Sequence, residues 1–166
     1  MAEKTLSDLF EDSLKDIYFA ERKIVAALPK MAKAASSPDL AAAFRSHLAQ
    51  TEEHVSRLER IFEIIGEKPK GKTCPAIEGI LKEGSELLED YAGSPAVDAA
   101  LISAAQAVEH YEITRYGTMK RWAEMLGFDD AAELLAVTLA EEAQTDEDLT
   151  ELAENGANEM AQQAAE

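Results

Sequence analysis

Residues Phe10–Leu28 read FEDSLKDIYFAERKIVAAL and decide the fold of the surrounding chain. The apolar side chains recur with the 3.6-residue period of an amphipathic helix, at Phe10, Leu14, Ile17, Ile24 and Leu28. Glu21 falls within this stripe, so the helix is expected to turn a carboxylate toward the core. An unpaired buried charge costs several kcal/mol, so Glu21 needs a proton, a basic partner or a metal ion.

The composition favours one soluble all-helical domain over residues 1–166. The chain has only 8 glycines and 5 prolines, and they stand at spaced positions. A net charge of -17 argues against direct binding to nucleic acid or to an anionic membrane surface. No run of about 18 apolar residues is long enough to span a bilayer, and the N-terminus has no signal-peptide core, so we expect a cytoplasmic protein.

Capping and breaking residues predict four long helices and one short helix. The first extends from Thr5, with a Thr5–Asp8 capping box, to about Ala34, and is expected to kink at Pro29. The second starts at Ser37–Pro38 and ends at Gly66, a shorter helix spans about Pro75 to Tyr91, the third starts at Ser94–Pro95 and ends at Gly127, and the fourth is capped by Asp129 or Asp130 and extends to about Asn155–Gly156.

The lengths of the connections predict how these helices are arranged. Two tight links join the first helix to the second and the third to the fourth, which gives two antiparallel hairpins. About 28 residues separate the hairpins, and a four-helix bundle with one long central crossover has ferritin-like topology. We therefore predict an all-α, ferritin-like four-helix bundle whose crossover between helices 2 and 3 carries the short extra helix.

Each of the other long helices also carries polar residues at a depth equivalent to that of Glu21. The candidates are His47, Gln50 and His54 on the second helix, Glu109 and Glu112 on the third, and Glu142 and Asp146 on the fourth. Side chains three or four positions apart share a helix face, so the helical period fits either Glu109 or Glu112 as the principal ligand of the third helix. Carboxylates and imidazoles together suit iron or manganese, so the pattern predicts a metal centre, most simply a dinuclear one.

Other residues leave alternatives open. Arg57 and Arg115 could neutralise the inward carboxylates in a buried ion-pair network without metal. Tyr18, Tyr111 and Tyr116 could be redox partners of a metal pair, although core packing is the simpler interpretation. Cys74, the one cysteine, is expected to be a partly buried thiol.

Several segments resemble a known family: Tyr18–Glu21 (YFAE), His47–Thr51 (HLAQT) with Arg57–Glu59, Cys74–Gly79 (CPAIEG), Asp98–Ile113 (DAALISAAQAVEHYEI), and Thr138–Glu142 (TLAEE) with Thr145–Asp146. Over nearly its whole length the chain resembles the YciF and YciE-like stress-associated bacterial proteins of the ferritin-like superfamily. The resemblance implies a ferritin-like bundle, a homodimer, a dinuclear metal centre and an association with stress.

The chain departs from this family pattern at Gln50, where the family has glutamate, and at His54, where it often has glutamine. Thr145 also stands where a typical ferritin-like Glu-x-x-His motif has histidine. An amide is a weaker ligand than a carboxylate, so full occupancy of two metal positions is in question. Two hypotheses follow: an iron or manganese protein that reacts with oxygen or peroxide, and a non-catalytic structural or stress protein. Iron storage in a hollow shell is a weaker third.

Overall fold

The computed structural model describes residues 3–163, which form helices and contain no strand. The elements in order are α1 (Leu6–Ala34), α2 (Pro38–Ile64), α3 (Pro75–Asp90), α4 (Val97–Leu126), α5 (Asp129–Leu152), a π-helical turn (Ala153–Ala157) and α6 (Asn158–Gln163). The predicted all-α class is therefore confirmed.

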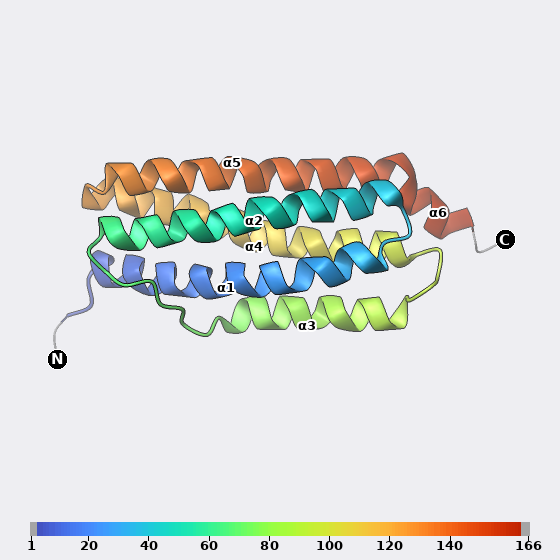
Figure 1. The fold of residues 1–166 in the computed structure, drawn as a ribbon, viewed down its shortest axis with the longest axis horizontal. Coiled ribbons are helices and arrows are strands. Elements are labelled where there is room, and N and C mark those ends of the chain that lie inside the picture. The colour runs from blue at the N-terminus through green and yellow to red at the C-terminus, as the bar shows by residue number, and fades with distance from the viewer. Residues whose placement is uncertain (1–2, 164–166) are drawn as a thin grey trace.

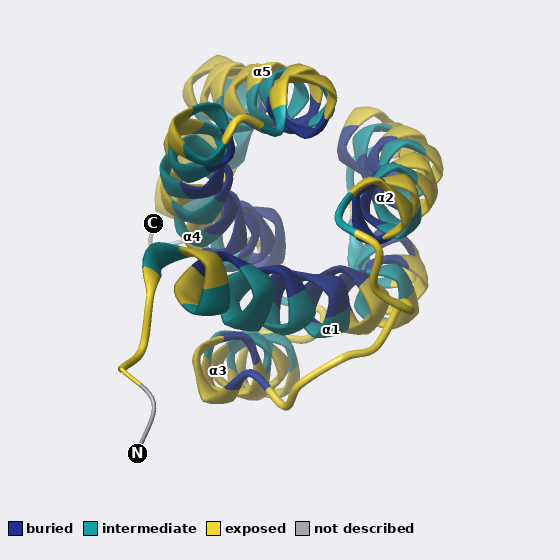
Figure 2. Cartoon of the chain, turned by 90° about the vertical axis from the view of Figure 1, so that its left-hand side faces the viewer, coloured by how far each residue is buried: buried dark blue, intermediate teal, exposed yellow. Residues whose placement is uncertain are grey.

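The four long helices form an elongated bundle, and α3 lies outside it (Figure 1). In the end-on view the buried faces of α1, α2, α4 and α5 turn toward a common centre, while α3 packs against α1 and α4 (Figure 2). The neighbours α1 and α2 form one hairpin, and α4 and α5 form the other. This arrangement confirms the long crossover between the second and third long helices, with its extra helix.

The sequence explains the start and the buried face of α1. Thr5 caps the helix, and it exchanges hydrogen bonds with Asp8 in the predicted capping box. All five predicted stripe residues are buried, and so is Glu21. The helix continues through Pro29 to Ala34. Glu21 is thereby fixed about midway along the bundle, on the side that faces α2 and α4.

A buried aspartate ties the first hairpin to the second. The carboxylate of Asp98, on α4, accepts hydrogen bonds from the backbone N–H groups of Ser36 and Ser37 at 2.7 and 2.9 Å. Ser37 in turn caps α2, as predicted, with Pro38 at the first helical position. Backbone donors at the connection between α1 and α2 are therefore satisfied by a residue from the neighbouring hairpin.

Two predicted start signals are displaced in the structure. Ser94 and Pro95 form a turn, and α4 begins at Val97 after Ala96, which makes no side-chain cap. The N-cap of α5 is Phe128, so the prediction of Asp129 or Asp130 as the cap is wrong. Both aspartates lie instead in the first turn, where negative charge interacts favourably with the helix dipole.

The long helices end largely where glycines allow a left-handed backbone. Gly66 and Gly127 adopt φ near 77° after α2 and α4, as the sequence predicts. The end of α5 comes earlier than expected, at Leu152, and Asn155 and Gly156 mark a break in helical geometry before α6. The C-terminal helical segment is therefore short.

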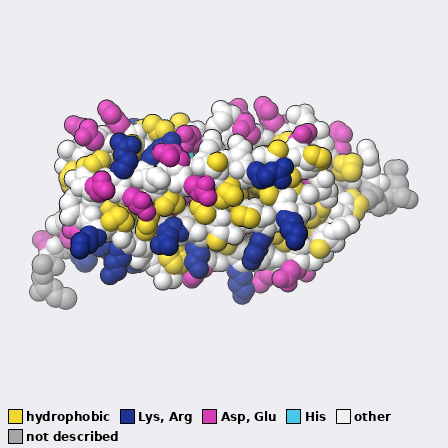
Figure 3. Space-filling view, in the orientation of Figure 1, with side chains coloured by type: hydrophobic (Ala, Val, Ile, Leu, Met, Phe, Trp, Pro, Cys, Tyr) yellow, Lys and Arg dark blue, Asp and Glu magenta, His cyan; other side chains and the backbone are white. Residues whose placement is uncertain are grey.

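The surface charge is uneven despite the net charge of -17. In the view of Figure 3, lysine and arginine side chains gather on the lower half of the molecule, over α1 and α3. Between residues 3 and 163, no helix is both long enough and apolar enough to cross a membrane.

Candidate metal centre

Six ionisable side chains from four helices meet in the middle of the bundle. They are Glu21 of α1, His47 and His54 of α2, Glu109 and Glu112 of α4, and Glu142 of α5, and each is at most 5% exposed. We refer to these six residues as the metal cluster. Every one of them is a residue that the sequence singled out as a candidate ligand, and the structure brings them together.

The distances within the metal cluster are short. His47 Nε2 lies 3.1 Å from Glu109 Oε1, and His54 Nδ1 lies 3.0 Å from Glu142 Oε1 and 3.4 Å from Glu21 Oε1. In an octahedral shell with metal–ligand bonds of about 2.1 Å, adjacent ligand atoms are about 3.0 Å apart. The observed spacing therefore suits ligands that share an ion.

Eight buried polar atoms of the metal cluster have no hydrogen-bond partner in the part of the chain that the structure describes. They are Glu21 Oε2, His47 Nε2, His54 Nδ1, Glu109 Oε2, both carboxylate oxygens of Glu112 and both of Glu142. Buried polar atoms are nearly always paired, because an unpaired one costs about 1–3 kcal/mol. Four of the eight, His47 Nε2, His54 Nδ1 and the two oxygens of Glu142, have ion-pair contacts at 3.0–3.8 Å within the cluster. The other four, all carboxylate oxygens, have neither a hydrogen bond nor an ion-pair contact with residues 3–163, which a bound cation would explain.

The cluster divides into two groups that share one residue. His47, Glu109, Glu112 and Glu142 place one ligand atom each within 4.8 Å of one another, and so do Glu21, His54 and Glu142. Glu142 directs one carboxylate oxygen toward His54, at 3.0 Å, and the other toward His47, at 3.8 Å. A carboxylate that faces two groups in this way is placed to bridge two ions.

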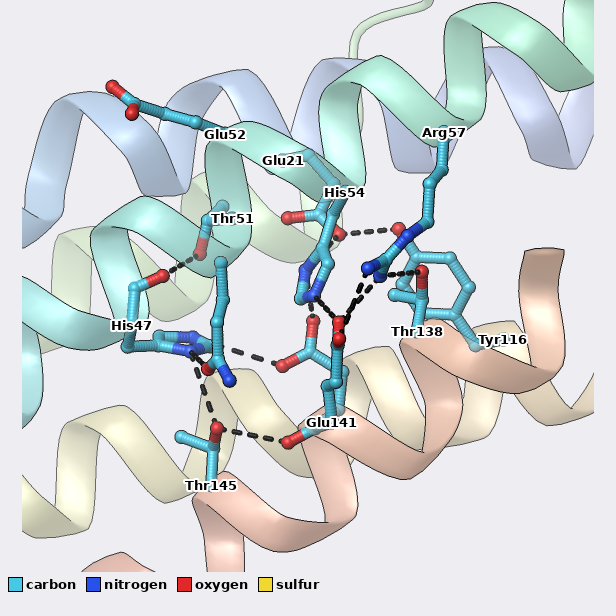
Figure 4. Close-up of polar contacts among 12 residues, drawn as sticks. Glu21, His47, Thr51, Glu52, His54, Arg57, Tyr116, Thr138, Glu141 and Thr145 are labelled. Carbon is cyan, nitrogen blue, oxygen red and sulfur yellow. Dashed lines mark hydrogen bonds and ion pairs between the residues drawn. The ribbon is translucent and has the colours of Figure 1, made fainter.

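The outer nitrogen of His54 is held by an ion pair. His54 Nε2 lies 2.9 Å from Glu141 Oε2, and Arg57 donates to both oxygens of Glu141, with the Nη2 bond at 3.1 Å (Figure 4). Arg57 also donates to Thr138 at 3.2 Å. A carboxylate behind a histidine commonly fixes the orientation of a metal ligand, so Glu141 directs Nδ1 of His54 into the cluster.

The arginines do not neutralise the buried carboxylates. Arg57 pairs with Glu141, which lies outside the cluster, and Arg115 stacks over the ring of Tyr111 at 5.3 Å. Among residues 3–163, no lysine or arginine forms an ion pair with any glutamate of the metal cluster. The alternative of a carboxylate–arginine network is therefore not what this core contains.

His47 is supported from behind by two neutral residues. Its Nδ1 lies 3.4 Å from Thr145 Oγ1 and 3.5 Å from Gln50 Oε1, and Thr51 donates to its backbone carbonyl at 2.8 Å (Figure 4). The imidazole of His47, on α2, thus lies against Thr145 of α5.

Two predicted ligands lie outside the metal cluster. Gln50 is half-buried and faces the outer nitrogen of His47 rather than the cluster. Asp146 accepts from Gln106 at 3.3 Å and pairs with the exposed His110 at 3.1 Å, on the outer side of α4 and α5. The structure therefore places Gln50 behind a candidate ligand, and it places Asp146 in a separate surface network.

Burial changes the acidity of the cluster. It raises the pKa of Glu109 to about 7 and that of Glu142 to about 8, and it raises the pKa of Glu112 well above its ordinary value. Burial would lower the pKa of His54, but the carboxylates of Glu142 and Glu21 outweigh it and raise that pKa to about 10. Without a cation, burial thus favours the protonated carboxyls of Glu109, Glu112 and Glu142.

Of the three candidate redox tyrosines, only Tyr116 contacts the metal cluster. Its buried hydroxyl donates a short hydrogen bond to Glu21. Tyr18 donates to Glu59 at 2.9 Å, and Tyr111 donates to Asp16 at 3.1 Å and lies 3.0 Å from the sulfur of Cys74. Cys74 is 1% exposed, more deeply buried than expected, and it caps α3.

The chain is similar to known proteins over nearly its whole length. Residues 5–162 match the model of a family described as a domain of unknown function, DUF892. Protein YciF of Escherichia coli K12 is 44% identical over 163 residues, which cover 98% of each chain.

Solved structures have the same fold. The E. coli stress protein YciF superposes with a TM-score of 0.89 at 44% identity, over 94% of this chain and 99% of that chain. YcfI of Rhodopseudomonas palustris, named as a candidate structural protein, gives 0.86 at 45% identity, over 89% and 94%. A protein from Xanthomonas campestris, 18% identical, shares the fold with a TM-score of 0.77, over 98% and 100%. The extent of these matches shows that the chain belongs to the DUF892 family and is similar throughout to the stress protein YciF.

Proposed function

We propose that this protein is a ferritin-like metalloprotein that binds two iron or manganese ions in the metal cluster and acts on dioxygen or peroxide. The observation that carries the proposal is a buried group of carboxylates and imidazoles from four helices, in which four carboxylate oxygens have neither a hydrogen bond nor an ion-pair partner among the described residues. A packed core does not otherwise leave so many polar atoms unpaired.

The donor set fits such ions. Four carboxylates and two imidazoles are the mixed oxygen and nitrogen ligands that iron and manganese accept. When these buried glutamates are ionised they need positive charge, and no lysine or arginine among residues 3–163 forms an ion pair with them. We assign His47, Glu109 and Glu112 to one ion and Glu21 and His54 to the other, with Glu142 between them. A reduced metal pair would supply the electrons for oxygen or peroxide chemistry.

The surrounding residues orient this set. Glu141 and Arg57 fix His54, Thr145 and Gln50 stand behind His47, and the hydroxyl of Tyr116 holds one oxygen of Glu21. The glutamine at position 50 leaves this ligand set complete, because its amide faces the outer nitrogen of His47 and is not one of the assigned ligands.

The test is elemental analysis by mass spectrometry after anaerobic loading with Fe(II) or Mn(II), on protein purified without a metal-affinity tag. We expect about two ions per chain in the wild type, a large loss in Glu21→Ala and Glu109→Ala, and no loss in Glu147→Ala. Glu147 is an exposed acidic residue on α5 and serves as the matched control. Equal metal content in all four proteins would refute the assignment.

A structural role without metal is the second candidate function. Its support is the raised pKa of Glu109, Glu112 and Glu142, because protonated carboxyls can remain buried in a folded chain without a cation. Under this alternative, a folded and stable protein would take up no metal after anaerobic loading. The name of YciF as a stress protein is compatible with either function.

A further inference from the structure

A pocket of about 150 Å³ lies inside the bundle beside the metal cluster. The exposed side chains that line it, Ser46 on α2 and Gln144 and Asp148 on α5, place its mouth between these two helices. At the other end it is lined by His47 and Glu109. We call this space the inner pocket, and it connects solvent with one half of the metal cluster.

The walls between mouth and cluster are apolar. Buried side chains of α1, α4 and α5 line them, including Leu28, Val108 and Leu149. An engineered protein cavity of about 150 Å³ with such walls stays dry and binds benzene or xenon. The inner pocket therefore has the size and lining to hold an apolar body of about six carbon atoms.

The charges around the inner pocket disfavour an anion. Of the described residues that line it, none is a lysine or arginine, and its two carboxylates are those of Glu109 and Asp148. An anionic ligand would have to lose its hydration without gaining a cationic partner, which is unfavourable. At the inner end, Glu109 Oε2 is buried without a hydrogen-bond or ion-pair partner among the described residues, and His47 Nε2 lies 3.1 Å from the other oxygen of Glu109, so a polar group of the ligand would meet the cluster there.

We propose that the inner pocket binds a small neutral molecule with an apolar body and one polar end, and that the polar end faces His47 and Glu109. Its role as the substrate site of the metal centre rests on the proposed function, whereas the binding itself does not. The volume excludes a chain-like molecule from this route, and the two carboxylates disfavour an anionic one in the metal-free protein.

Methyl NMR on metal-free protein tests the proposal, with cyclopentanol as the neutral probe and cyclopentanecarboxylate as its anionic counterpart. We expect cyclopentanol to shift the methyl signals of Leu28, Val108 and Leu149 saturably, with a dissociation constant on the order of a millimolar. The carboxylate is expected to leave these signals unchanged. Absence of saturable shifts, or equal binding of both probes, would overturn the proposal.

Cavity-filling variants locate the binding. Ala105→Leu fills the inner pocket, and Ala43→Leu narrows it from the half-buried face of α2 if the first variant does not fold. The control is Ala26→Leu, which adds the same side chain to an adjacent pocket between α1, α3 and α4. We expect at least tenfold weaker cyclopentanol binding in the first two variants and unchanged binding in the control.

The outcomes separate this inference from the proposed function. Wild-type protein that binds cyclopentanol but takes up no iron or manganese would refute the metal centre and leave the inner pocket as a ligand site. Protein that takes up two ions but binds cyclopentanol no more weakly after Ala105→Leu would refute the inner pocket alone.

Discussion

Replacing Glu142 with glutamine is expected to stabilise the metal-free protein while it weakens metal binding. The fold raises the pKa of Glu142 from 4.5 to about 8. The contribution of this carboxyl to the stability of the fold is therefore complete below pH 4.5, and it is lost progressively as the pH rises from 4.5 through 8. At pH 7 the cost to the metal-free fold is about 3 kcal/mol, from 2.5 pH units at about 1.4 kcal/mol each. Glutamine keeps the shape of the side chain and removes this cost.

Glu141→Gln is the matched control, because the two glutamates are adjacent on α5 but differ in environment. Hydrogen bonding from Arg57 lowers the pKa of Glu141, so its contribution is present above pH 4.5 and is lost as the pH falls. Glu141 is 28% exposed, and we expect its replacement to destabilise the fold by at most about 1 kcal/mol.

The assay is urea unfolding of chelator-treated protein, followed by circular dichroism at pH 5 and pH 7. Glu142→Gln should gain about 1 kcal/mol at pH 5 and about 3 kcal/mol at pH 7 over the wild type, and it should lose the stabilisation that iron or manganese gives. A Glu142→Gln protein that is less stable than the wild type at pH 7, yet binds metal equally well, would show that Glu142 is neither a costly buried carboxyl nor a metal ligand.

Three further results are expected. Metal binding at pH 7 should release at least one proton per chain, because Glu109 and Glu142, with pKa values of about 7 and 8, are partly protonated. Calorimetry in buffers of different ionisation enthalpy measures this release. Binding heats that do not depend on the buffer would contradict it. Thr145→Val should weaken metal binding about tenfold, because the hydroxyl behind His47 is lost; unchanged affinity in a metal titration would disprove that support. Asp98→Ala should destabilise the protein by about 2 kcal/mol in thermal unfolding without changing the metal content, because it removes the acceptor for the backbone N–H groups of Ser36 and Ser37. A loss of metal in this variant would show that the role of Asp98 is not confined to the connection between α1 and α2.

Helical periodicity predicted which core positions carry charge. The positions of His47 and His54 differ by seven residues, or about 20° around the helix, so both face the cluster. Glu109 and Glu112 are both brought to it, which answers the question that their phase left open. Gln50 is about 60° away from His47, and this rotation puts its amide behind the imidazole.

The residues that were misplaced depend on contacts between helices. Asp146 is rotated by about 40° from Glu142, enough for Gln106 and His110 of α4 to bind its carboxylate outside the cluster. The role of Glu141 could also not be predicted from the sequence of α5 alone, because it depends on contacts with Arg57 and His54 of α2. Sequence periodicity gives the direction of a side chain, whereas its partner is set by the packed neighbours.

Anomalous diffraction from crystals loaded anaerobically with Fe(II) would show whether two ions bind around Glu142. We predict two anomalous peaks in each chain, one beside His47 and one beside His54, with the Glu142 carboxylate between them. Peaks confined to surface carboxylates, such as the Asp146 and His110 pair, or no peaks at all, would contradict this prediction.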